Sequence, residues 1–249
     1  MSVIYKVLDI LEVFLRQGNE LGLFELSEST GLNASSTHRI VSALVRRGYL
    51  SQMQKRGKYS LTTRLLEFSN VIRMRTRIRD VAIPFLDMLS KETNEFVGLS
   101  IRGMNEAVCI EGIESRRDIR LSERVGARFP LYCTGVGKVL SAFMKDHEIE
   151  TFLQDVPLVS RTPNTIVDPY KLRKELLKIR REGIAIDNEE YAIGIRCVAA
   201  PIRDSNGNTV AVINITAPSV RLGKDRLKEL KSLVIQYSQK ISKAIGYVG

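Results

Sequence analysis

The stretch LNASSTHRIVSALVRRGYL, residues 32–50, predicts a helix with two contrasting faces, and this helix strongly limits what the chain can fold into. Asn33 is a good N-cap, and Gly48 is a suitable stop after a helix that runs to about Arg47. One face of this helix gathers Thr37, Ile40, Val41 and Leu44. The opposite face gathers hydroxyls and guanidiniums, namely Ser35, Arg39, Ser42 and Arg46. Such a helix can pack its first face on neighbouring helices and present its second face to something outside the domain.

Two helices are expected before it. Val3, Val7, Leu11 and Phe14 share one face of the first helix, which ends near Gly18. The second reads FELSEST and ends at Gly31, where a left-handed residue is often needed. A helix, the short turn 31–33 and a helix with an outward polar face are typical of a helix-turn-helix, whose second helix reads base edges in the major groove.

A hairpin is expected next. The segment YLSQMQKRGKYSLT has two strand-like halves around KRGK, so that Lys55, Arg56 and Lys58 lie at its tip. A hairpin in this position is a wing, and a basic tip suits phosphate contacts. Hairpin tips are also commonly charged for solubility, so the whole order of elements carries more weight than these three cations. The order predicts a winged helix-turn-helix that binds duplex DNA.

The distribution of charge agrees with this prediction. Residues 33–79 hold eleven lysines and arginines and one acid, Glu67, so this segment accounts for the whole formal net charge of +10. A run of charge is usually a solvated surface, but a single basic module in an otherwise neutral chain also favours a nucleic-acid partner.

The predicted DNA contacts fall into two groups. Base edges are expected to meet Ser35, Ser36, His38 and Arg39, with Ser42 on the same face. His38 has a second interpretation as an ordinary surface residue. The phosphates are expected to meet the outer cations Arg46, Arg47, Lys55, Arg56 and Lys58.

The 249 residues are long enough for two domains. We expect a DNA-binding domain over residues 1–62, a linker helix over 63–80 and a larger domain over 81–249. Pro84 is expected either to kink the linker helix or to start a new one, which puts a hinge near 77–84.

The larger domain alternates between strand-like and helical segments. FVGLSIR, AVCIEGI, IRCVAAPIRD and TVAVINITA read as strands, and Asn206-Gly207 predicts a hairpin between the last two. GVGKVLSAFM, HEIETFLQ, YKLRKELLKIRREG and the C-terminal segment read as helices. The pattern predicts an α+β fold with a largely antiparallel sheet.

Three stretches of this domain, RVGARFPLYCTGVGKVLSAF, GIAIDNEEYAIGIRCVAAPIRD and AVINITAPSVRL, resemble the effector domain of IclR-type transcription regulators. The first domain resembles their winged helix-turn-helix, apart from Ala34, where the family often has Lys or Arg. The resemblance implies a GAF-like effector domain, a small-molecule effector, and dimers or dimers of dimers on palindromic operators. PLYCTGVGKVL, DNEE…GIRC and KISKAIGY look most similar to repressors that respond to the sugar acid 2-keto-3-deoxygluconate. An activator of the same family is the alternative.

The effector site has one element that can be argued from chemistry. Thr134-Gly135-Val136-Gly137 opens a predicted helix, whose unpaired N–H groups can bind a carboxylate at Gly135 and Val136. The alternative is a plain helix cap with glycines for close packing. By resemblance, Asp187 accepts hydrogen bonds from ligand hydroxyls. Arg124 and Glu190 are left out of the predicted site, with a role as structural partners in this region as their interpretation. The resemblance also gives the remaining pocket residues as Leu121, Phe129, Ile195, Cys197, Asn214 and Thr216.

Other classes of protein are less well supported. The three cysteines, Cys109, Cys133 and Cys197, fit neither a disulfide framework nor a zinc site, and no P-loop, GxGxxG or HExxH occurs. No transmembrane segment or signal peptide is expected, so we predict a cytoplasmic protein. From the absence of metal-binding and nucleotide-binding motifs we predict no metal and no cofactor. We also predict that it is not an enzyme. The rival hypothesis is a thiol-dependent enzyme that uses Cys133 at a helix N-terminus, and a third is a non-specific architectural DNA-binding protein.

Overall fold

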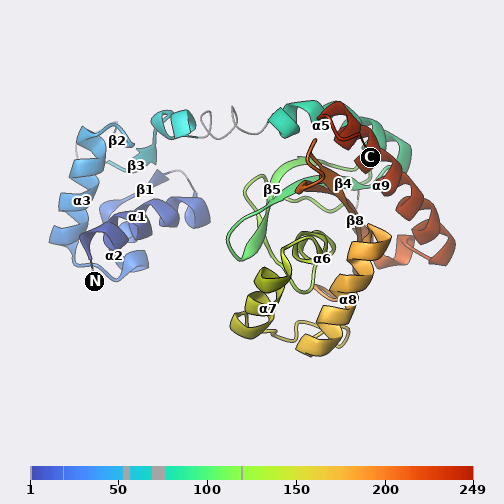
Figure 1. Ribbon diagram of the computed structural model, residues 1–249. Helices are drawn as coiled ribbons and strands as arrows, with labels where there is room; N and C mark the ends of the chain where they lie inside the picture. The colour runs from blue at the N-terminus through green and yellow to red at the C-terminus, as the bar shows by residue number, and fades with distance from the viewer. Residues whose placement is uncertain (1, 19, 53–56, 69–76, 119, 249) are drawn as a thin grey trace. The chain divides into compact units, whose positions relative to one another are not determined.

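The computed structural model describes residues 2–18, 20–52, 57–68, 77–118 and 120–248. The chain forms two compact units, residues 1–76 and residues 77–249. They are coloured from blue to cyan and from green to red in Figure 1.

Three helices form the core of the N-terminal unit. They are α1 (Val3–Gln17), α2 (Leu23–Thr30) and α3 (Ala34–Arg46), as the sequence predicts. Gly31 ends α2 in the left-handed conformation, and the Asn33 side chain accepts a hydrogen bond from the Ser36 amide at the start of α3. Apolar side chains of all three helices, including Ile10, Leu26 and Val41, are buried together.

A small antiparallel sheet completes this unit. Its strands are β1 (Glu20–Leu21), β2 (Leu50–Gln52) and β3 (Tyr59–Leu61), in the order β1-β3-β2. The pairing of β2 with β3 gives the expected wing, whereas β1 is a short extra strand that sequence patterning missed. Residues 53–56 at the predicted tip, including Lys55 and Arg56, lie outside the described residues.

The C-terminal unit is built on one antiparallel sheet of six strands. The strands are β4 (Phe96–Arg102), β5 (Glu106–Ile113), β6 (Arg128–Pro130), β7 (Ala185–Asn188), β8 (Ile195–Arg203) and β9 (Thr209–Pro218). They follow the order β6-β5-β4-β9-β8-β7. The β8–β9 hairpin turns at Gly207, whose φ of 81° is the left-handed conformation that Asn206-Gly207 predicts.

Helices cover both faces of this sheet (Figure 1). On one face lie α5 (Arg77–Thr93) and α9 (Lys224–Ala244), and on the other lie α6 (Gly135–Ala142), α7 (Asp146–Asp155) and α8 (Pro169–Glu182). The short helix η1 (Ser219–Arg221) precedes α9. Alternate residues of β8 point to opposite layers, since Val198 and Ala200 join the core under α5 and α9 while Cys197 and Ala199 join the core under α6.

This architecture confirms the predicted α+β class and the winged helix-turn-helix, and it corrects one local expectation. Pro84 does not start a helix, because α5 already begins at Arg77 and continues through Pro84 to Thr93. Pro84 is exposed on the outer side of that helix. Residues 69–76 of the expected linker helix lie outside the described residues. Among the residues that the structure does describe, no helix is both long and apolar enough to cross a membrane.

Candidate functional site

The polar face of α3 is turned away from the core of its unit. Thr37 and Val41 are fully buried, whereas Ser35, Arg39 and Arg46 are exposed. The sequence predicts this division from helical periodicity, because only one side of α3 can pack on α1 and α2. The exposed side therefore has guanidiniums available to a molecule outside the unit.

The other predicted DNA contacts also lie outside the core. His38, Arg47 and Lys58 are exposed, and Ser36 and Ser42 are half-buried. At the start of α3, the Ser35 hydroxyl donates to the Asn33 side chain at 2.9 Å. The cap therefore fixes the first turn of α3, the turn that enters the groove in helix-turn-helix proteins.

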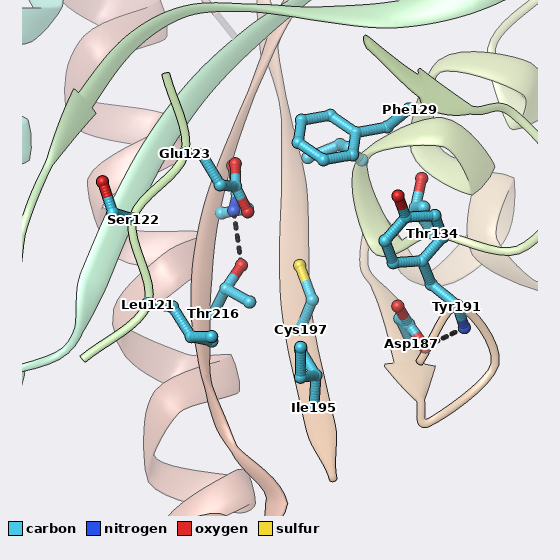
Figure 2. Close-up of a pocket in the computed structure, with 12 residues that line it drawn as sticks. Leu121, Ser122, Glu123, Phe129, Thr134, Asp187, Tyr191, Ile195, Cys197 and Thr216 are labelled. Atoms are coloured by element: carbon cyan, nitrogen blue, oxygen red, sulfur yellow. Dashed lines mark hydrogen bonds between the residues drawn. The ribbon is translucent and has the colours of Figure 1, made fainter. Parts of the chain in front are cut away.

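The C-terminal unit contains a pocket of about 200 Å³ between the sheet, the start of α6 and the segment before β6 (Figure 2). Eight of its lining residues are predicted effector contacts: Leu121, Phe129, Val136, Asp187, Ile195, Cys197, Asn214 and Thr216. Strand register explains much of this assembly. Asp187 on β7, Cys197 on β8 and Thr216 on β9 are direct cross-strand neighbours, so their side chains form one row on the same face of the sheet.

Asp187 is buried at one end of this row, with an exposure of 3%. Its Oδ1 accepts hydrogen bonds from the Glu190 amide at 2.7 Å and the Tyr191 amide at 3.3 Å. Burial raises the pKa of Asp187 to about 7, although these two amides favour the ionised form. The carboxyl group is therefore held in place and can exchange a proton near neutral pH.

A second carboxyl group, that of Glu123, enters the pocket from the segment before β6. Burial raises the pKa of Glu123 to about 7, while hydrogen bonding to Thr216 lowers it. Asn214 donates from Nδ2 to the Thr216 hydroxyl at 2.8 Å. Asn214 Oδ1 is buried and has no hydrogen-bond partner within the described residues.

The N-terminus of α6 forms the opposite wall. Thr134 caps this helix by accepting a hydrogen bond from the Gly137 amide at 3.0 Å. The preceding amides, of Gly135 and Val136, belong to the first turn, where no intrahelical partner exists. Val136 lines the pocket, whereas Gly135 packs against β8, since a Cβ there would lie 2.9 Å from Cys197 Sγ.

A buried ion pair ties α6 to the loop after β7. Lys138 on α6 is 1% exposed and lies 2.5 Å from the Glu190 carboxylate. Its Nζ also donates to the Ile186 carbonyl at 2.6 Å. The Glu190 amide donates a hydrogen bond to Asp187, so the ion pair with Lys138 helps to fix the position of the Asp187 carboxyl group. This is a structural role for Glu190. Arg124, for which a structural role was also expected, is exposed.

The three cysteines are buried in the C-terminal unit. Burial raises the pKa of the Cys133 thiol to about 12, so the thiol is protonated at neutral pH. Within the described residues, no group of three or more His, Cys, Asp or Glu side chains could hold a metal ion.

In the comparison with known proteins, each of the two units matches a model of the same protein family. A family model described as the IclR helix-turn-helix domain matches residues 3–53, and one described as bacterial transcriptional regulator IclR C-terminal matches residues 72–243. The chain belongs to the IclR family of transcriptional regulators.

Individual IclR-family members align over nearly the whole chain. The HTH-type transcriptional regulator KdgR of Escherichia coli (strain K12) is 33% identical and covers 99% of this chain and 94% of its own. The HTH-type transcriptional repressor AllR of the same strain is 30% identical, covering 95% and 88%. The crystal structure of the Thermotoga maritima IclR covers 98% of both chains at 32% identity, with a TM-score of 0.80.

Sequence reasoning missed four lining residues of this IclR-type pocket: Ser122, Glu123, Thr134 and Tyr191. Thr134 was recognised as part of the helix opening but not as a pocket residue. Glu123 lies in a segment without regular structure, so no periodicity indicates where its side chain points. Tyr191 follows Asp187 in the loop after β7 and meets Phe129 edge to face, with ring centroids 6.1 Å apart.

Proposed function

We propose that this IclR-family regulator is a repressor of a catabolic operon and that a small carboxylate-bearing metabolite releases it from DNA. Sugar acids such as 2-keto-3-deoxygluconate are the candidate effectors. The observation that carries the proposal is the pocket of about 200 Å³, where the first turn of α6 meets the buried Asp187 carboxyl group.

The chemistry of the α6 end suits a carboxylate. Amide groups in the first turn of a helix are unpaired donors, and the helix dipole favours a negative charge in front of them. Val136, in the first turn of α6, is one of the residues that line the pocket. Asp187 then supplies an acceptor for a ligand hydroxyl. The name of one relative supports repression, because AllR of Escherichia coli is an HTH-type transcriptional repressor.

DNA binding is proposed to use the exposed face of α3, with Ser35, Ser36, His38 and Arg39 at base edges and Ser42 beside them. Arg46, Arg47 and Lys58 would contact phosphates, as would Lys55 and Arg56, which lie outside the described residues. We propose a homodimer, or a dimer of dimers, on a palindromic operator, because helix-turn-helix dimers bind two symmetric half-sites.

Enrichment of genomic fragments on the purified protein, with and without sugar acids, tests the proposal. Operator affinity of the full-length protein is then measured by fluorescence anisotropy. We expect the effector to weaken operator binding by about 5–150-fold, the usual range for coupling between two sites. Asp187→Ala is expected to abolish this response and leave effector-free DNA binding intact. An unchanged response in Asp187→Ala would remove Asp187 from the effector site.

The same experiment separates the alternatives. An activator would keep or gain operator affinity with the effector, and a non-specific architectural DNA-binding protein would bind operator and random duplexes equally. For the thiol enzyme, mass spectrometry would reveal turnover or an adduct on Cys133. The burial of Cys133 and its protonated thiol weigh against that chemistry.

A further inference from the structure

The charge balance of the pocket is unusual for a site that takes an acid. Among the residues that the structure describes, its lining includes the two carboxyl groups of Glu123 and Asp187 but no Lys, Arg or His. A carboxylate ligand can therefore meet only neutral donors in this lining, such as the hydroxyl of Tyr191. The two carboxyl groups suit the parts of a ligand that can donate hydrogen bonds.

The two carboxyl groups lie at opposite ends of the pocket. Figure 2 shows Asp187 beside Thr134 and Tyr191, and Glu123 above Thr216 on the far side of the Cys197 sulfur. Cys197 lies between the two groups, since it pairs across the sheet with Asp187 on one side and with Thr216, below Glu123, on the other. A ligand with its carboxylate at α6 therefore extends past Cys197 towards Glu123.

One acceptor near the Glu123 end has no hydrogen-bond partner within the described residues. Asn214 is 1% exposed and uses Nδ2 for the Thr216 hydroxyl, which leaves its buried Oδ1 without a partner in the described structure. A buried acceptor without a donor is costly, and a ligand or an ordered water normally supplies the missing hydrogen. Gly98, opposite Asn214 in the sheet, makes room for this oxygen, because a Cβ there would lie 2.6 Å from it.

We propose that Glu123 is a specificity-determining residue, which together with Asn214 selects acids that carry hydroxyl groups on the carbons remote from the carboxylate. The inference rests on the proposed function, since it assumes an acidic effector in this pocket. Hydroxyl groups suit Glu123 better than an ammonium group does. A carboxyl group that is partly protonated at neutral pH can both accept a hydrogen bond from a hydroxyl and donate one to it. Such a group attracts a cation less strongly than a fully ionised carboxylate does.

Matched six-carbon acids test the selection. D-Gluconate, D-galactonate and 2-keto-3-deoxygluconate carry hydroxyls, hexanoate carries none, and 6-aminohexanoate carries an ammonium group instead. Isothermal titration calorimetry with the full-length protein is expected to show at least one hydroxy acid binding tenfold or more tightly than hexanoate. Glu123→Leu is expected to weaken that acid tenfold or more and to leave hexanoate unchanged or tighter.

Two further variants keep the test decisive. Glu123→Gln preserves the shape of the side chain but removes its ionised form, which makes stronger hydrogen bonds to hydroxyls than an amide does. It is expected to lower hydroxy-acid affinity at least threefold, and it covers the case in which Glu123→Leu fails to fold. Asp118→Asn removes one carboxylate from the same segment at an exposed position outside the pocket, and it is expected to bind every acid like the wild type.

The outcomes distinguish this inference from the proposed function. If acids bind and release DNA but Glu123 variants keep the wild-type preference, the role of Glu123 is wrong while the acidic effector stands. Tightest binding of hexanoate or of 6-aminohexanoate would also overturn the inference. If none of the five acids binds, the acidic effector itself is wrong, and the selection by Glu123 is rejected with it.

Discussion

At the scale of single residues, the proposed reading of DNA depends on which way a few side chains of α3 point. Arg39 is exposed, while its neighbour Ile40 is 5% exposed and packs in the core of the N-terminal unit. A guanidinium held on an exposed helix face can form two hydrogen bonds to a guanine edge. Its removal should therefore affect the choice of sequence and not only the affinity.

We expect Arg39→Ala to weaken operator binding by about 1–3 kcal/mol and to relax the preference for one base pair. Competition binding with operators mutated at single positions measures both effects. A variant with wild-type affinity and wild-type preference would show that this face of α3 does not read bases.

A second prediction at this scale concerns Asp187 and pH. Its pKa is about 7 in the folded protein against an ordinary value of 3.8, so the folded state holds the proton more tightly than the unfolded chain does. The stabilising contribution is complete below about pH 4 and is lost as the pH rises to about 7.

The wild type should therefore lose stability relative to Asp187→Asn between pH 5 and pH 7, by on the order of 1 kcal/mol per pH unit, with no further loss above that range. Denaturant unfolding at several pH values measures this difference. A difference that stays constant across the range would mean that Asp187 is ionised throughout.

At the scale of elements, the shape of the pocket depends on the contacts between α6 and the loop after β7. Lys138 and Glu190 form an ion pair almost without solvent contact, and the amide of Glu190 holds Asp187. Thr165 also helps to fix this loop, since its hydroxyl donates a hydrogen bond to the Glu190 carbonyl at 2.7 Å. Removal of one charge leaves the other buried without compensation.

We expect Lys138→Met to lower the free energy of unfolding by about 3–5 kcal/mol, because Glu190 would remain as an uncompensated buried charge. Lys178→Met, at an exposed position on α8, is the matched control and should change stability by less than about 0.5 kcal/mol. Recovery of stability in the double variant Lys138→Met/Glu190→Gln would confirm the cause. Equal stability of Lys138→Met and the wild type would contradict it.

At the scale of the whole molecule, the charges are divided unequally along the chain. The formal net charge of +10 is carried by residues 33–79, and the rest of the chain is balanced. Association with duplex DNA should therefore depend steeply on salt and should depend mainly on the N-terminal unit, because phosphate contacts release counterions.

Lys58 tests this expectation, because it is exposed immediately before β3. Lys58→Ala should weaken binding to operator and random duplexes alike and should reduce the slope of log affinity against log salt by about 1. Titrations at several salt concentrations measure the slope. A selective loss for the operator alone would assign Lys58 to base reading instead.

Periodic patterns in the sequence predicted most of the elements, because helices and strands bury residues at fixed spacings. The faces of α3, the cap at Asn33 and the hairpin at Asn206-Gly207 depend on neighbours within a few residues, so local chemistry is enough to predict them. Patterning missed β1, β6 and β7, which are short and depend on partner strands far along the chain.

The sequence by itself thus determined the two kinds of domain, the outward face of α3 and, through resemblance, most of the residues that line the pocket. Only the tertiary structure decided that Asp187, Cys197 and Thr216 form one row across three strands, and that Glu123 meets them from an irregular segment. It also decided which charges are buried, including the partnership of Lys138 with Glu190. The physical reason is that burial and long-range pairing depend on how distant segments pack together, and no short-range pattern records this.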